Sequence, residues 1–261
     1  MYQSKKVWQR LLLMFVLTTM SEVTFSEIIN LEDAINKAGH QRMLTQRMLK
    51  SYAMKGLDVQ ADVAHEQLST SVALFDEQLN ELILYSPNEI VKKKLQRVES
   101  LWRPVRSMIT GPVKRELAGT LLQKNDALLM ATDDVVKQLE KISTTRHGQL
   151  VSVAGRQRML SQRLAKLYML RAWGMNNARI LAEENKAEEA FRKAMVMLTE
   201  AKENTKPINN ALKEASMQWD LLKSGLDRKD NNFIPLIVAM TSENLLHTMD
   251  YVTGMYSELT R

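Results

Sequence analysis

The sequence contains no cysteine, and it has only nine glycines and five prolines among 261 residues. Without cysteine, the chain can form neither a structural disulfide nor a lipoprotein anchor. The scarcity of glycine and proline, together with many Leu, Ala, Met, Lys, Glu and Gln residues, favours helices over strands. Because 45% of the residues are apolar, the chain can also fill a hydrophobic core. The composition therefore predicts an all-α protein.

Residue patterns typical of enzymes are also missing. The four histidines are scattered, and none has a second histidine at a metal-binding spacing. The sequence has no glycine-rich phosphate loop, no nucleophile elbow and no cysteine nucleophile. We therefore predict no catalytic residue, no metal site and no cofactor, and we do not expect an enzyme.

The N-terminal segment has the order of charges and apolar residues found in secretory signals. Lys5, Lys6 and Arg10 precede an apolar run over residues 11–20. That run is shorter than the about 20 apolar residues that span a bilayer. We predict a signal peptide over residues 1–26 and a soluble periplasmic protein; the alternative is an uncleaved N-terminal helix that anchors the chain in the membrane.

The positive charge is concentrated in two windows. Five basic and no acidic residues lie between residues 34 and 57, and eight basic and no acidic residues lie between residues 141 and 182. The rest of the chain is mildly acidic, whereas a nucleic-acid-binding surface needs a broad basic stripe. We therefore expect no nucleic-acid partner.

Both basic windows contain the same motif, AGHQRMLTQR from residue 38 and AGRQRMLSQR from residue 154. Ten of 17 positions are identical between residues 38–54 and 154–170. Weaker correspondences continue at offsets of 116 or 117, in the pairs Phe75 and Phe191, Trp102 and Trp219, Leu128 and Leu245, Asp133 and Asp250, and Val135 and Val252. The repeat predicts two related units, over residues 27–145 and 146–261.

Clusters of glycine, proline and asparagine divide each unit into four stretches with helical periodicity. These clusters lie at residues 56–58, 86–88 and 111–112 in the first unit, and at 174–177, 206–210 and 227–232 in the second. Short connections between helices predict a four-helix bundle in each unit. No proline lies between Pro112 and Pro207. The last helix of the first unit therefore either continues into the second unit as one long rod or breaks at His147–Gly148.

The motif predicts a site for a small oxyanion. On a helix, each copy places a glycine, an arginine and a glutamine in one sector: Gly39, Arg42 and Gln46 in the first copy, and Gly155, Arg158 and Gln162 in the second. Arginine offers a planar fork of donors, an amide can donate as well, and glycine allows a second helix to approach closely. If two such helices face each other, two guanidinium groups meet with no carboxylate nearby in the sequence. A bound anion would then supply the missing charge.

Other interpretations of the same residues stay open. Arg42 and Arg158 can pair with carboxylates on other helices instead. Arg47 and Arg163 lie about 80° from the glycine on the helix, so they either contribute to the anion site or brace neighbouring helices. Without an anion, the chain would be a helical protein-interaction or scaffold module with no small-molecule ligand.

The two motifs resemble the P-box of periplasmic sensor domains, namely those of NarX-type nitrate and nitrite kinases and of PilJ-type methyl-accepting chemotaxis transducers of type IV pili. In the nitrate sensors, the arginine of the "RM" pair from each of two symmetry-related helices binds the anion at a dimer interface. The resemblance implies that Arg42 and Arg158 bind nitrate or nitrite, with Gly39 and Gly155 supporting a close approach of the helices. It also implies a signalling role with a membrane receptor or another signalling partner, and a possible homodimer.

Overall fold

The computed structural model describes residues 28–143, 146–227 and 233–259. In these ranges the chain forms helices and no strand, which confirms the all-α prediction. The elements are α2 (Leu31–Gly56), α3 (Ala61–Tyr85), α4 (Glu89–Ile109), the short 3-10 helix η1 (Arg115–Leu117), α5 (Ala118–Ser143), α6 (Arg146–Ala172), α7 (Ala178–Thr199), α8 (Lys206–Leu226) and α9 (Pro235–Glu258). The predicted signal peptide lies outside the described residues. None of the described helices is apolar enough over a sufficient length to cross a membrane.

Three helices begin at a capping asparagine, and two of these asparagines, Asn88 and Asn177, lie in a predicted break. Asn30, Asn88 and Asn177 each accept a hydrogen bond from the backbone N–H three residues later, at 2.8, 3.0 and 3.1 Å. These side chains satisfy donors that the first helical turn leaves without a partner inside the helix. The glycine, proline and asparagine clusters therefore predict most of the helix boundaries correctly.

The predicted break at residues 206–210 is wrong by several positions. Helix α7 ends at Thr199 and α8 already begins at Lys206, with Thr205 as its N-cap and Pro207 inside the first turn. Proline is tolerated there because the first turn of a helix needs no backbone donor, and its fixed φ suits helical geometry. Pro207 therefore marks the start of a helix, and the connection precedes it.

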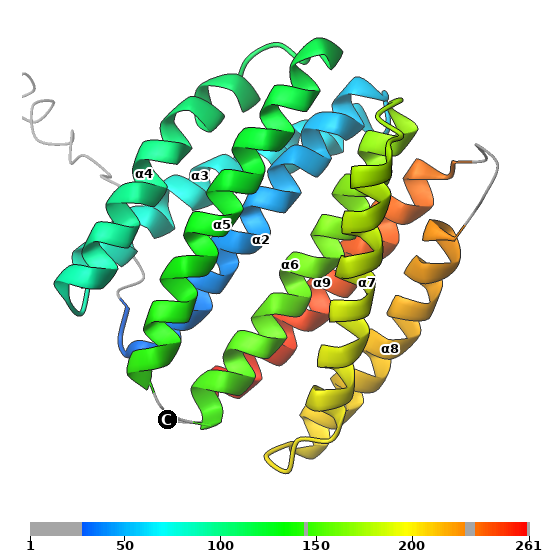
Figure 1. Ribbon diagram of the computed structural model, residues 1–261. Helices are drawn as coiled ribbons and strands as arrows, with labels where there is room; N and C mark the ends of the chain where they lie inside the picture. Colours follow the sequence, from blue (N-terminus) through cyan, green and yellow to red (C-terminus); the bar gives the residue numbers. More distant parts are fainter. Residues whose placement is uncertain (1–27, 144–145, 228–232, 260–261) are drawn as a thin grey trace, which may run out of the picture.

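The two motif-bearing helices, α2 and α6, lie side by side at the centre of the molecule (Figure 1). Helix α2 also packs against α3 and α5, and α4 packs against α5. In the second half of the chain, α6 packs against α7 and α9, and α8 packs against α9. The other six α-helices therefore either contact α2 or α6 directly or pack against a helix that does.

The prediction of a long continuous rod is wrong. Helix α5 ends at Ser143 and α6 begins at Arg146, and the two helices run back along each other (Figure 1). The alternative break at His147–Gly148 is also displaced, because both residues belong to α6. Chain reversal brings the apolar and polar faces of α6 onto α2. A rod would have separated these faces and left them in water.

Equivalent aromatic pairs fill the core of both halves. The rings of Phe75 and Trp102 lie 4.3 Å apart between their centroids, and those of Phe191 and Trp219 lie 4.2 Å apart. In each half a motif glutamine donates to the backbone carbonyl of the phenylalanine: Gln41 at 3.1 Å and Gln157 at 2.8 Å. The repeated residues thus make repeated contacts, which fix both motif helices against their neighbours in the same way.

Candidate functional site

Arg42 is buried on α2 and uses only part of its guanidinium group. Its side chain is 3% exposed, and its Nη1 donates to Oδ1 of Asp133 on α5 at 2.8 Å. Among the residues that the structure describes, neither Nε nor Nη2 of Arg42 has a hydrogen-bond partner, although both atoms are buried. These two nitrogens form one edge of the guanidinium, the edge that can hold two oxygens of one planar acceptor. Arg42 therefore presents a complete bidentate edge in the protein interior.

Arg158 on α6 repeats this arrangement with one difference. Its Nη1 pairs with Asp250 on α9, and its Nε is buried without a partner in the described part of the chain. Its Nη2 donates to Asn36 on α2, at 2.8 Å to the side-chain Oδ1 and at 3.2 Å to the backbone oxygen. The two arginines therefore share an aspartate contact and differ at Nη2.

The two guanidinium groups meet over Gly39. A Cβ at this position would lie 3.5 Å from Nη2 of Arg42 and 3.5 Å from Nη2 of Arg158, so these nitrogens are within about 7 Å of each other. A Cβ at Gly155 would lie 3.0 Å from Nη2 of Arg158. The sequence predicted that both glycines admit a second helix backbone. Their nearest neighbours are instead arginine side chains, so the glycines make room for the guanidinium groups.

The structure pairs each arginine with a carboxylate on another helix, which is the alternative that the sequence left open. Asp133 and Asp250 follow the arginines by 91 and 92 residues, and the fold brings them into contact with the motif. Burial lowers the pKa of both arginines, and the charge of the adjacent aspartate opposes that shift. The repeat contains a signal for these partners, because the two aspartates recur at an offset of 117.

The charges near Arg42 differ from those near Arg158. Burial of Asp133 raises its pKa, but the hydrogen bond from Lys137 and the charge of Arg42 have the larger combined effect, and the pKa is lowered. On the other side, burial and the nearby charge of Arg158 lower the pKa of His40 to about 4. At neutral pH, His40 is therefore uncharged and Lys137 adds a positive charge only near Arg42.

Gln46 and Gln162 lie one helical turn after Arg42 and Arg158, and their amide N–H groups donate to other residues of the protein. The Nε2 of Gln46 donates to Oγ1 of Thr45 at 2.8 Å and to Oδ1 of Asn125 at 3.3 Å. The Nε2 of Gln162 donates to the backbone oxygen of Ser242 at 3.0 Å. Both amides therefore fasten a motif helix to α5 or α9, and the structure does not bring their donors to the arginine pair.

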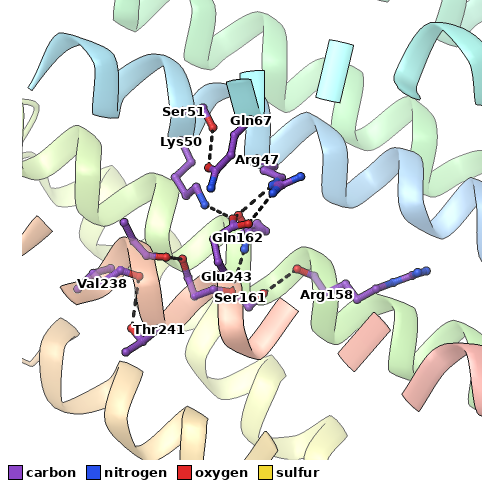
Figure 2. A network of polar contacts seen from close by, with 12 residues as sticks. Arg47, Lys50, Ser51, Gln67, Arg158, Ser161, Gln162, Val238, Thr241 and Glu243 are labelled. Atoms are coloured by element: carbon purple, nitrogen blue, oxygen red, sulfur yellow. Dashed lines mark hydrogen bonds and ion pairs between the residues drawn. The ribbon is translucent and has the colours of Figure 1, made fainter. Parts of the chain in front are cut away.

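Arg47 and Arg163 are also directed away from the arginine pair. Arg47 binds the carboxylate of Glu243 on α9 through Nε at 3.3 Å and Nη2 at 2.6 Å, and Lys50 binds the same carboxylate (Figure 2). Arg163 pairs with Glu183 on α7 at 2.6 Å. These contacts favour the interpretation in which the second arginine of each motif braces neighbouring helices.

The arrangement of buried arginines is accompanied by a family match. Residues 24–131 match the model of the type IV pili methyl-accepting chemotaxis transducer N-terminal domain, PilJ. This segment is similar to the PilJ N-terminal domain. Domains of the PilJ family are sensor-type and non-catalytic. No match was found among curated proteins or among solved structures.

The PilJ segment contains the first motif but not the second. It includes Asn36, Gly39 and Arg42 on α2, whereas Asp133 follows its last residue and α6 lies entirely outside it. The arginine pair therefore joins a residue of the segment that matches PilJ to a residue of the half that follows. No group of His, Asp or Glu side chains within the described ranges is arranged to hold a metal ion.

Proposed function

We propose that the chain is the ligand-binding module of a PilJ-type sensor, and that it holds one small planar oxyanion, nitrate or nitrite, between Arg42 and Arg158. The observation that carries this proposal is the buried Nε and Nη2 edge of Arg42, which has no partner among the described residues and whose Nη2 lies over Gly39 together with Nη2 of Arg158. Buried charged donors are costly when they are left unsatisfied. A planar anion satisfies both donors of one edge with two of its oxygens.

The proposal includes a second PilJ-like unit over residues 146–261. Its support is the repeated motif and the equivalent pairs Arg42–Asp133 and Arg158–Asp250. Because α2 and α6 belong to one chain and pack together, both arginines come from the same molecule. We therefore propose one anion per chain and no need for a homodimer. We also propose that the module is exported to the periplasm and acts with a membrane-bound signalling partner.

The geometry favours a planar monovalent oxyanion over other small anions. Chloride accepts from both nitrogens of an edge only through bent hydrogen bonds to a single atom, whereas a planar oxyanion places one oxygen opposite each nitrogen. A divalent anion such as sulfate would bring a second negative charge beside Asp133 and Asp250, which already occupy the Nη1 donors. Nitrate has four heavy atoms, so the ceiling of about −1.5 kcal/mol per atom limits its dissociation constant to roughly tens of micromolar.

Thermal unfolding in the presence of anions tests this proposal. Nitrate at about 100 times its dissociation constant should stabilise the folded protein by about 2.7 kcal/mol, which raises Tm by roughly 5 °C for a chain of this size. Chloride and sulfate at matched ionic strength serve as controls and should raise Tm much less. If nitrate and chloride shift Tm equally, no specific oxyanion site exists.

One observation favours the scaffold function as the second candidate. Both arginines already have an aspartate partner, so α2 and α6 can pair without a ligand. In that case the motif faces serve only to hold the two halves together. Nitrate would leave Tm unchanged, and loss of the aspartate contacts would destabilise the fold more than it would alter any response to anions.

The substitution Gly39→Ala should weaken nitrate binding without unfolding the protein. Its methyl group would meet both Nη2 atoms at 3.5 Å, an ordinary contact distance, but it would stand between the two guanidinium groups. Alanine also favours a helix over glycine by about 1 kcal/mol. We expect roughly tenfold weaker binding, equivalent to about 1.4 kcal/mol, in a calorimetric titration with nitrate.

Gly254→Ala on α9 is the matched control for Gly39→Ala. A Cβ at Gly254 would meet no atom within 4 Å, so this variant makes the same chemical change in open space. It should bind nitrate like the wild type. Equal affinities of the two variants would show that the anion does not lie over Gly39.

A further inference from the structure

Asn36 makes the contact that distinguishes the two arginines. In both, Nη1 binds an aspartate and Nε is buried without a partner among the described residues. Nη2 of Arg158 donates to two oxygens of Asn36, whereas Nη2 of Arg42 has no such acceptor. The repeat does not copy this residue, because Ser152 stands at the equivalent position 116 residues later. Ser152 donates instead to Glu140.

We propose that Asn36 gates the anion site, because its side-chain carbonyl oxygen competes with the anion for Nη2 of Arg158. This inference rests on the proposed function and deepens it. Asn36 lies one helical turn before Gly39, and so on the same face of α2. Its Oδ1 is therefore directed at the guanidinium group that would hold one side of the ligand.

The competition follows from the donors that each arginine has left. Arg42 can bind two anion oxygens through Nε and Nη2 at once. Arg158 can offer the same edge only after Nη2 exchanges the oxygen of Asn36 for an oxygen of the ligand. The amide oxygen is neutral, whereas an oxygen of the anion shares a full negative charge, so the guanidinium attracts the anion oxygen more strongly. An anion therefore displaces Asn36, whereas a neutral ligand of the same shape does not.

Because of this competition, only a negatively charged ligand can bind Arg42 and Arg158 at the same time. A ligand bound only by Arg42 leaves Arg158 with Asn36, so the first half of the chain holds the ligand alone. A ligand that displaces Asn36 connects Arg42 to Arg158 and links α2 to α6 through itself. The state of Asn36 thus reports whether the ligand is bound by one half or by both.

Calorimetric titration with sodium nitrate tests the gate in two opposite variants. Asn36→Ser shortens the side chain to the residue of the other copy and removes the side-chain oxygen that accepts at 2.8 Å, while the longer contact to the backbone oxygen remains. We expect its affinity for nitrate to rise roughly threefold to tenfold, the range expected when one competing hydrogen bond is lost. Asn36→Asp places a permanent carboxylate on Arg158, and its affinity should fall at least about tenfold.

Asn210→Ser, an exposed asparagine on α8, is the matched control and should bind like the wild type. Tm without nitrate separates gating from folding, because Asn36→Asp should raise this Tm while it weakens binding. Unchanged or weaker binding by Asn36→Ser would overturn the gate and indicate that Asn36 is itself a ligand or has no role. If the wild type and every variant give no heat, the proposed function fails, and the gate fails with it.

Discussion

The substitution Glu243→Gln should destabilise the protein by about 3–5 kcal/mol, the typical cost of leaving a buried cation without its partner. The carboxylate of Glu243 binds both Lys50 and Arg47, and the side chain of Lys50 is fully buried (Figure 2). A glutamine side chain keeps the shape and removes the charge. Because Glu243 lies on α9 while Lys50 and Arg47 lie on α2, the substitution weakens the contact between the two halves.

Chemical denaturation measures this loss, and Glu189→Gln provides the control. Glu189 on α7 is 49% exposed and pairs with Arg192 and Lys193 on the surface. Exposed pairs contribute about 0–1 kcal/mol, so the control variant should unfold close to the wild type. If the free energy of unfolding of Glu243→Gln lies within the same narrow range, the cluster around Lys50 does not hold the two halves together.

The same cluster predicts a loss of stability in acid. Burial raises the pKa of Glu243, but the charges of Lys50 and Arg47 lower it more, to about 2. In the unfolded chain the pKa of a glutamate is near 4.3. A carboxylate with a depressed pKa stabilises the fold above its unfolded pKa and loses that contribution as the pH falls through its folded pKa. The stability difference between wild type and Glu243→Gln should therefore shrink between about pH 4.3 and pH 2.

The equivalent cluster on the other side of the interface is weaker. Lys166 is also fully buried, but its Nζ lies 3.5 Å from Asp126, which it shares with Arg179. Burial lowers the pKa of Lys166 to about 8, and Asp126 opposes this shift only in part. The two halves are therefore joined by reciprocal contacts of unequal strength, with Glu243 as the stronger one.

The helices and their pairing are largely readable from the sequence because they depend on local patterns. Asparagine caps and glycine breaks set most of the boundaries, and the repeat indicates that α2 and α6 are equivalent. The sequence left open whether the helix of the first unit continues into the second or breaks, because the reversal depends on what α6 buries against α2 and not on the residues near the connection. Pro207 was predicted to lie in a break between helices, but it lies in the first turn of α8. The residue type alone does not separate these two positions, because proline suits both.

The arginine site is only partly readable from the sequence. The motif indicates Arg42, Arg158 and Gly39, because these residues share one helical face in both copies. It does not indicate Asn36, which has no equivalent in the second copy, or the direction in which Arg47 turns. Those features depend on how two different helices meet, and a single-helix projection contains no such information. Asp133 and Asp250 were visible as a repeated pair, but only the fold assigns them to the arginines.

The substitution Arg42→Ala should weaken nitrate binding at least about thirtyfold. It removes both donors of the one edge that has no competing acceptor, and each hydrogen bond to a charged group contributes about 1.5–3 kcal/mol. The fold should survive, because Asp133 keeps Lys137 as a partner at 2.7 Å and remains 24% exposed. Arg158→Ala should cost less, roughly tenfold, since Asn36 already competes for its Nη2.

Arg163→Ala is the control that separates the arginine pair from the motif as a whole. It removes an arginine of the same repeat that contacts Glu183 instead of the other motif helix. Calorimetric titration should therefore give nearly wild-type affinity for this variant, with Arg42→Ala weakest and Arg158→Ala between them. An equal loss in all three would mean that nitrate responds to the general positive charge of the motif. Wild-type affinity in Arg42→Ala would show that nitrate binds outside the arginine pair and would overturn the proposed site.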